Sequence, residues 1–179
     1  MRPGGGKQKG AEFERVVCKD LSLWLSKGTR EDLFWRSAMS GGRATLGMRE
    51  GKAHAASAGD VSAIHFLGAK FIEHFYVECK FYKDLQLKNV LFNGPSKLMT
   101  FWKDAAFEAT VYKKLPLLIA KENHVPILVV LSSEGRDFFN GVDGAMTAHL
   151  PTHDAFIYDY NLFLQQAPHK CLYSRLTST

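Results

Sequence analysis

The chain has 179 residues, of which 46% are hydrophobic and 12% aromatic. This composition excludes a disordered protein and suffices for one domain with its own core. No apolar run approaches the ~20 residues that cross a bilayer, and the three separated cysteines, Cys18, Cys79 and Cys171, form neither a disulfide framework nor a Cys-x-x-Cys pair. The first residues lack the apolar stretch of a secretory signal, so we expect a cytoplasmic protein. A net charge of +5 favours a polyanionic partner, with nucleic acid as the leading candidate.

The chain opens on a glycine-rich basic segment followed by a helical pattern. Residues 1–9 predict a flexible basic N-terminal arm ahead of a single domain, residues 10–179. Apolar residues then recur at helical spacing over residues 11–27, and Gly28 supplies a stop. Glu14 lies along the apolar stripe of this helix. Because burying a carboxylate is costly without a cation or hydrogen-bond donors, we predict that Glu14 contacts a metal ion or its water. The alternative is a glutamate at the core edge, paired with Arg15 or a lysine.

The next segments predict short strands around a long loop. Residues 32–37 read as a strand that ends at a Ser40-Gly41-Gly42 turn, and residues 43–59 as a flexible surface loop near the site. Residues 61–66 and 71–81 are predicted to be two strands of a hairpin, connected by residues 67–70. This hairpin would bring Asp60 beside Glu78, eighteen positions later.

The second strand of the predicted hairpin carries Glu78-Cys79-Lys80. Side chains two residues apart share a face at roughly 6.6 Å, so Glu78 and Lys80 should point together while Cys79 points to the opposite face. The odd positions of this run are mostly apolar and the even ones mostly polar or amphipathic. One face should therefore pack in the core and the other should be wet or functional.

The second half of the chain predicts further helices and strands. Helical spacing indicates a second long helix over residues 96–114, and a continuous apolar run predicts a strand over residues 126–131 that is buried on both faces. A final strand at residues 155–160 and a short helix at residues 161–166 complete the prediction.

Two carboxylates and an amine on one strand pair match the needs of phosphodiester hydrolysis. We predict that Asp60, Glu78 and the backbone carbonyl of Cys79 bind Mg²⁺, which Mn²⁺ could replace, and that Glu14 binds a second metal ion or its water. Lys80 either helps to deprotonate the attacking water or stabilises charge on the phosphate, and the sequence leaves both roles open. The alternative for the same residues is ordinary surface charge on a hairpin.

The order of these motifs resembles that of a known nuclease superfamily. Lys9-Gly10 through Glu14-Arg15, Arg36-Ser37 through Ser40-Gly41, Gly59-Asp60, and Glu78-Cys79-Lys80 resemble the PD-(D/E)xK nucleases, and most closely the archaeal and viral Holliday-junction resolvases. Gly59 stands where the motif name has proline. The 43–59 segment and the stretch from Asp60 to Glu78 are longer than in compact resolvases.

This resemblance implies an α/β fold with a restriction-endonuclease-like core, in which helices flank a mixed central β-sheet. It also implies Mg²⁺-dependent cleavage of DNA by a homodimer. Glu14, Asp60, Glu78 and Lys80 take the catalytic places in this match, and Ser40 takes that of the serine beside the scissile phosphate.

Several basic and polar residues surround the predicted site in sequence and could bind DNA phosphates. The residues predicted to bind DNA are Lys7, Lys9, Arg36, Ser40, Arg43 and Lys83. Three functions remain open: a structure-specific endonuclease acting on branched DNA, a sequence-specific endonuclease of restriction or homing type, and a non-catalytic nucleic-acid-binding protein. Retained carboxylates argue against the third, because they repel DNA.

Overall fold

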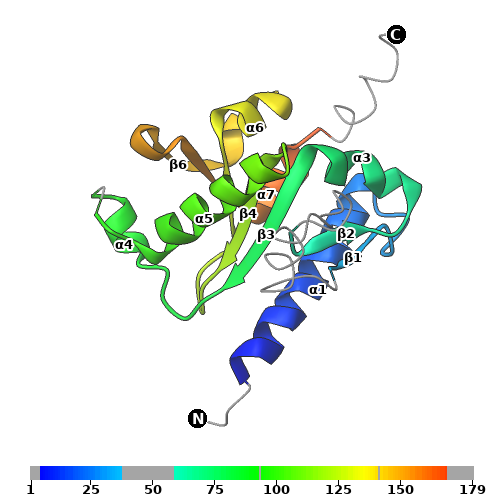
Figure 1. Ribbon diagram of the computed structural model, residues 1–179, viewed down its shortest axis with the longest axis horizontal. Coiled ribbons are helices and arrows are strands. Elements are labelled where there is room, and N and C mark those ends of the chain that lie inside the picture. The colour runs from blue at the N-terminus through cyan, green and yellow to red at the C-terminus, as the bar shows by residue number, and fades with distance from the viewer. Residues whose placement is uncertain (1–4, 38–58, 93, 141, 169–179) are drawn as a thin grey trace.

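The computed structural model describes residues 5–37, 59–92, 94–140 and 142–168, and its centre is a five-stranded mixed sheet (Figure 1). The strand order is β3-β4-β5-β7-β6; β3 and β4 are parallel and the other neighbours antiparallel. The strands are β3 (Phe75–Phe81), β4 (Leu115–Lys121), β5 (Leu128–Leu131), β6 (Met146–Leu150) and β7 (Ala155–Asp159). The predicted mixed sheet flanked by helices is thus confirmed.

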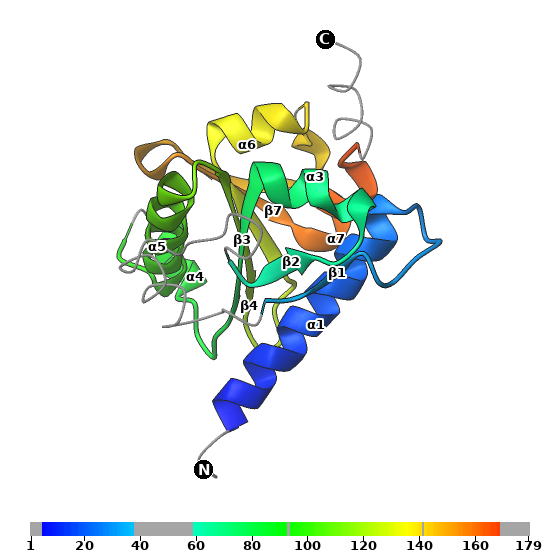
Figure 2. The same ribbon diagram turned by 45° about the vertical axis from the view of Figure 1, so that its right-hand side comes forward.

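Helices cover both faces of this sheet. Helix α1 (Gly5–Leu25) lies on one side and α5 (Lys97–Val111) on the other (Figure 2). Successive strand residues point to opposite faces, so Val77 and Cys79 join the core beneath α1, whereas Leu118 and Val130 join the core beneath α5. Residues 128–131 are all buried, which confirms a two-sided strand over this part of the predicted range, residues 126–131. Pro126 and Ile127 precede the strand.

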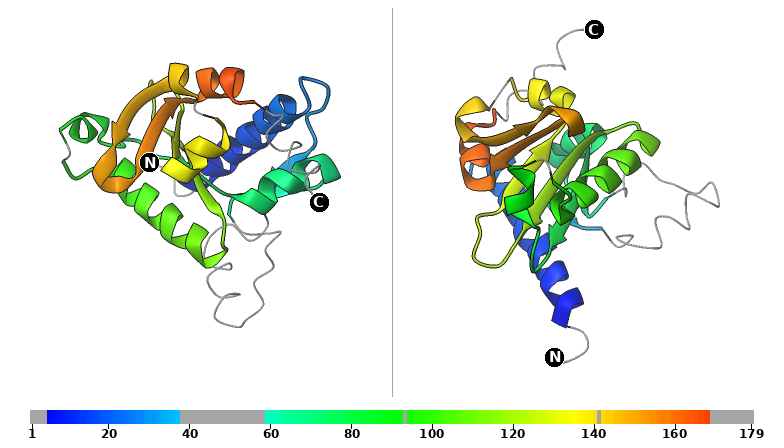
Figure 3. Two further views of the ribbon diagram at one scale, coloured as in Figure 1. Left: turned by 90° about the horizontal axis from the view of Figure 1, so that it is seen from above. Right: turned by 90° about the vertical axis from the view of Figure 1, so that its left-hand side faces the viewer.

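Shorter elements complete the fold (Figure 3). They are β1 (Phe34–Arg36), β2 (Val61–Ala63), α3 (Phe66–His74), α4 (Leu87–Val90), α6 (Ser133–Phe138), α7 (Tyr160–Gln166) and two 3-10 helices, Asp143–Ala145 and Pro151–His153. Strands β1 and β2 form a separate antiparallel ribbon beside α1. Helices α1 and α7 also touch, since the indole of Trp24 donates to the Ala167 carbonyl at 3.0 Å. No helix in the described ranges is long and apolar enough to span a membrane.

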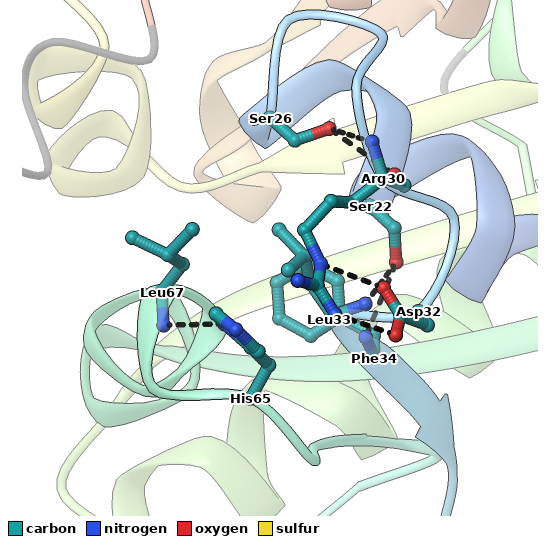
Figure 4. A network of polar contacts seen from close by, with 8 residues as sticks. All are labelled: Ser22, Ser26, Arg30, Asp32, Leu33, Phe34, His65 and Leu67. Atoms are coloured by element: carbon teal, nitrogen blue, oxygen red, sulfur yellow. Dashed lines mark hydrogen bonds and ion pairs between the residues drawn. The ribbon is translucent and has the colours of Figure 1, made fainter.

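A buried serine attaches β1 to α1 (Figure 4). The Ser22 hydroxyl donates to the Cys18 carbonyl at 2.7 Å and accepts from the backbone N–H groups of Leu33 and Phe34, both at 3.1 Å. These two N–H groups are buried and need an acceptor. The Ser22 hydroxyl therefore fixes where the start of β1 lies against α1.

The predicted hairpin before Glu78 is wrong. Residues 66–74 form helix α3, and β2 pairs with β1 instead of β3. The buried positions Gly68, Phe71 and Ile72 have helical spacing, and the His65 ring caps the helix by accepting from the Leu67 N–H at 3.2 Å. Phe71 continues the alternation of Phe75 and Val77 and so resembles a strand residue, but it lies on the buried side of helix α3, and the strand begins at Phe75.

Other boundaries shift less. Helix α1 already includes residues 5–9 of the predicted arm, whereas residues 1–4 lie outside the described residues. It ends at Leu25, and Gly28 follows with a positive φ of 82° and its N–H bonded to the Leu23 carbonyl, as expected for a glycine stop. The predicted Ser40 turn and nearly all of the 43–59 loop also lie outside the described residues. The division into an arm and one domain stays a prediction.

Candidate active site

Asp60 lies at the free edge of β3, just before β2 begins. Its N–H donates to the Val77 carbonyl at 2.8 Å, and its carboxylate Oδ2 accepts from the Cys79 N–H at 2.8 Å. Asp60 thereby satisfies two polar groups on the edge that β4 does not cover, although no hairpin brings it there. Only 6% of the residue is exposed.

Gly59 permits this close approach. Its φ is 84°, and a Cβ at this position would lie 2.6 Å from the Val77 carbonyl oxygen. Real side chains do not tolerate such a contact, and the positive φ disfavours them as well. The glycine that replaces the motif proline is therefore required by the geometry that brings Asp60 against β3.

Glu78 and Lys80 share one face of β3 and form an ion pair. Their side chains are 16% and 34% exposed, while the Cys79 side chain is buried on the opposite face, in the core beneath α1. The predicted same-face geometry is thus confirmed. Because the N–H and C=O of a strand residue point to the same side, the Cys79 carbonyl faces the same free edge as its N–H.

Glu14 approaches the site from α1. Its Oε2 accepts from the Arg36 guanidinium at 2.8 Å, and the two side chains are 13% and 31% exposed. Among the described residues the partner of Glu14 is therefore Arg36 of β1, in place of Arg15 or a lysine. Arg36 in turn precedes Ser37, whose N–H donates to the Asp60 carbonyl at 2.8 Å.

The site holds more negative charge than its surroundings compensate. Burial, then the charges of Glu78 and Glu14, raise the pKa of Asp60 from 3.8 to about 7, against the opposing effects of the Cys79 N–H and Lys80. Burial also raises the pKa of Glu78, although Lys80 opposes this shift. A bound cation would relieve both carboxylates.

The donor set fits a divalent cation such as Mg²⁺. No group of three or more His, Cys, Asp or Glu side chains within the described ranges forms a complete metal cage. Mg²⁺ does not need one, because it is usually held by one or two carboxylates and keeps several waters. Asp60 and Glu78 supply two carboxylates and Cys79 a backbone oxygen.

Lys80 remains a cation in this arrangement. Burial alone would lower its pKa, but the carboxylates of Glu78 and Asp60 outweigh burial and raise it above the ordinary value. An ammonium group held in this way is a poor proton acceptor at neutral pH.

A cavity of about 290 Å³ adjoins Glu78 and Lys80 between β3 and α5. Sequence reasoning missed its other polar lining residues. The strand alternation could have indicated Tyr76, which has the same parity as Glu78; nothing in the sequence singles out Asp104 and Glu108. The cavity is lined by Tyr76, Glu78, Lys80, Phe101, Asp104, Ala105, Phe107 and Glu108.

The predicted DNA-binding residues are spread around the site. Lys7 and Lys9 are exposed at the start of α1, and Lys83 is exposed in the connection after β3. Arg36 is held by Glu14. Ser40 and Arg43 lie outside the described residues.

A mixed sheet with acidic residues and a lysine at the edge of one strand is the arrangement expected of a PD-(D/E)xK nuclease core. The family model described as "Phage putative PDDEXK endonuclease" matches residues 5–164. The chain therefore belongs to this family of PD-(D/E)xK nucleases, and its fold is the restriction-endonuclease-like fold. Membership confirms the superfamily resemblance and makes the protein a nuclease with DNA as substrate. Searches of curated proteins and of solved structures found no match.

Proposed function

We propose that the protein is a Mg²⁺-dependent DNA endonuclease, with Mn²⁺ able to replace Mg²⁺, that cleaves branched DNA as a homodimer inside the host cell. The buried Asp60 carboxylate carries the metal part of this proposal. Its pKa of about 7 reflects its burial and, after that, the negative charge of neighbouring Glu78. Such a site would select a cation at neutral pH.

Asp60, Glu78 and the Cys79 carbonyl would hold the metal ion, and Glu14 would hold a second ion or its water. When bound, the metal supplies a Lewis acid for the phosphate and a more acidic water. To contact a second ion or its water, the Glu14 carboxylate would have to break its ion pair with Arg36 or divide its oxygens between the two. Arg36 would then be available to a DNA phosphate, as its predicted DNA-binding role requires.

Lys80 would act as a fixed ammonium that stabilises negative charge on the phosphate. Its raised pKa and its ion pair with Glu78 support this role over that of a base. Around it, Lys7, Lys9 and Lys83 would bind the DNA backbone on the flanks of the cut, together with Arg36, Ser40 and Arg43.

Branched DNA and the homodimer rest on the motif order, which resembles that of the junction resolvases. Two subunits also offer a simple route to paired cuts in two strands. Cleavage at one sequence in linear duplex DNA is the alternative on the same core.

The test compares four-way junctions, linear duplexes and single strands, each incubated with the protein and Mg²⁺. Paired nicks at the junction, lost in Asp60→Asn while junction binding persists, are the expected result. Cuts at a single sequence in the duplex, independent of the junction, would establish the alternative specificity. Full activity of Asp60→Asn, or equal activity with EDTA, would overturn the metal site. Light scattering of the free protein and of the junction complex measures the number of subunits.

A further inference from the structure

Tyr76 and Glu108 form a polar contact beside Glu78 that the site described above does not use. The Tyr76 hydroxyl donates to Glu108 Oε2 at 2.9 Å, across the interface between β3 and α5. We propose that this pair positions the Glu78 carboxylate for the metal ion and strengthens metal binding without contacting the metal. The inference rests on the proposed metal-dependent function.

On the strand side, Tyr76, Glu78 and Lys80 follow one another on a single face of β3. Exposure rises along this row, from 4% for Tyr76 to a 34% exposed Lys80 side chain. Tyr76 therefore forms the buried end of the row that carries the predicted catalytic residues. Tyr76 points to the same face of β3 as Glu78 and is buried, so it can support the Glu78 side chain from inside the protein.

On the helix side, α5 runs along this row in the opposite direction. The Lys80 ammonium lies 5.7 Å from the Phe101 ring centroid near the start of α5, and the Tyr76 ring stacks on Tyr112 at 5.7 Å just past its end. Glu78 lies between these two contacts. The helix residues facing it across the cavity are therefore those near Asp104 and Glu108.

The Tyr76 hydroxyl is well suited to fix a neighbouring carboxylate. Its ring is clamped by Tyr112 and packs with buried Ala109, so the hydroxyl has little freedom to move. Through its bond to Glu108 it holds a second carboxylate on the wall of the cavity that Glu78 also lines. Repulsion from Glu108 disfavours movement of the Glu78 carboxylate towards α5. It favours the position beside Lys80, at the edge that Asp60 occupies.

A merely structural contact would have a different consequence. If the Tyr76–Glu108 bond only attached α5 to β3, its loss would lower stability but leave metal affinity unchanged. If the pair positions Glu78, its loss should weaken metal binding in the folded protein. Residues that orient metal ligands typically change metal affinity or activity by about 10–100-fold.

The experiment measures Mn²⁺ binding to the full chain by titration calorimetry, without DNA, for wild type, Tyr76→Phe and Glu108→Gln. We expect about 10-fold weaker binding in each variant. The Mg²⁺ concentration for half-maximal junction cleavage should rise by a similar factor, while the rate at saturating Mg²⁺ stays within about two-fold. The double variant should resemble the single ones, because the two residues act as a unit.

Two matched controls come from the same cavity and cluster. Asp104→Asn removes another carboxylate one turn earlier on α5, and Tyr112→Phe removes another hydroxyl from the stacked tyrosines. Both should bind Mn²⁺ as the wild type does. An equal loss in Asp104→Asn would show a general charge effect and overturn the positioning role.

The outcomes also separate this inference from the proposed function. A wild type that neither binds Mn²⁺ nor cleaves DNA overturns both. A wild type that binds and cleaves, with unchanged affinity in folded Tyr76→Phe and Glu108→Gln, overturns this inference alone. Thermal unfolding of each variant verifies that it is folded. If Tyr76→Phe does not fold, Glu108→Gln still tests the pair, because Glu108 is partly exposed and buried Tyr76 is unchanged.

Discussion

Replacing Asp60 with asparagine should stabilise the metal-free protein while abolishing cleavage. The folded state raises the pKa of Asp60 from 3.8 to about 7. At about 1.4 kcal/mol per pH unit, holding the ionised carboxylate in place costs the fold about 4 kcal/mol at pH 8. Asparagine is neutral and keeps an oxygen that can accept from the Cys79 N–H. Allowing for the burial of its amide group, we expect a gain of about 2–4 kcal/mol in the free energy of unfolding at pH 8.

The pH dependence of this gain has a definite sign. Between pH 3.8 and about 7, folded Asp60 binds its proton more tightly than the unfolded chain does, so wild-type stability falls as the pH rises through this window. Below the window, Asp60 is protonated in both states and the two proteins should differ little. Above it the full difference is reached. At pH 5 the difference should be about a third of its value at pH 8.

Urea unfolding at pH 5 and pH 8, with EDTA present, measures these differences. Added Mg²⁺ should stabilise the wild type more than Asp60→Asn and so narrow the gap, because a ligand stabilises the state that binds it. Asp104→Asn serves as the control, since it removes an exposed carboxylate from the lining of the neighbouring cavity. A variant that is less stable than the wild type at pH 8, or a gap that does not change with pH, would refute the reasoning.

Three further substitutions test the geometry. Gly59→Ala should cost about 2–4 kcal/mol and displace Asp60, because its Cβ would meet a backbone carbonyl at 2.6 Å; the two effects are read by urea unfolding and by Mn²⁺ titration. Lys80→Met should change DNA affinity by no more than about three-fold but slow cleavage at least about 100-fold at saturating Mg²⁺. A variant that loses DNA affinity but cleaves bound DNA at the wild-type rate would contradict the role of Lys80. Ser22→Ala should cost about 2–4 kcal/mol, because it leaves two buried N–H groups without their acceptor, whereas an unchanged unfolding midpoint would show that water replaces the hydroxyl.

The sequence was sufficient for the parts of the fold that have a clear pattern. Helices α1 and α5 carry helical spacing over several turns, and strand β5 belongs to a continuous apolar run that is too short for a typical helix. The prediction for residues 66–74 failed because Phe71 fits both the alternation of the following strand and the helical spacing with Gly68. The buried position of Gly68 becomes visible only once β1 packs beside it. The same limit applies to Glu14. Its inward placement was predictable, but its partner Arg36 lies twenty-two residues away on another element.

The position of Asp60 was predicted correctly from an incorrect connection, and the reason lies in the edge of β3. That edge presents the Val77 carbonyl and the Cys79 N–H on the side that β4 leaves open. Asp60 satisfies both, one with its backbone and one with its side chain, and this requires a glycine before it but no hairpin after it. The intervening chain is therefore free to form helix α3, provided that it returns to β3 in register. The bond to Cys79 holds the Asp60 carboxylate beside Glu78 even though repulsion between the two disfavours that arrangement. The fold thus retains a destabilising pair of acids at an edge where a bound cation would stabilise them.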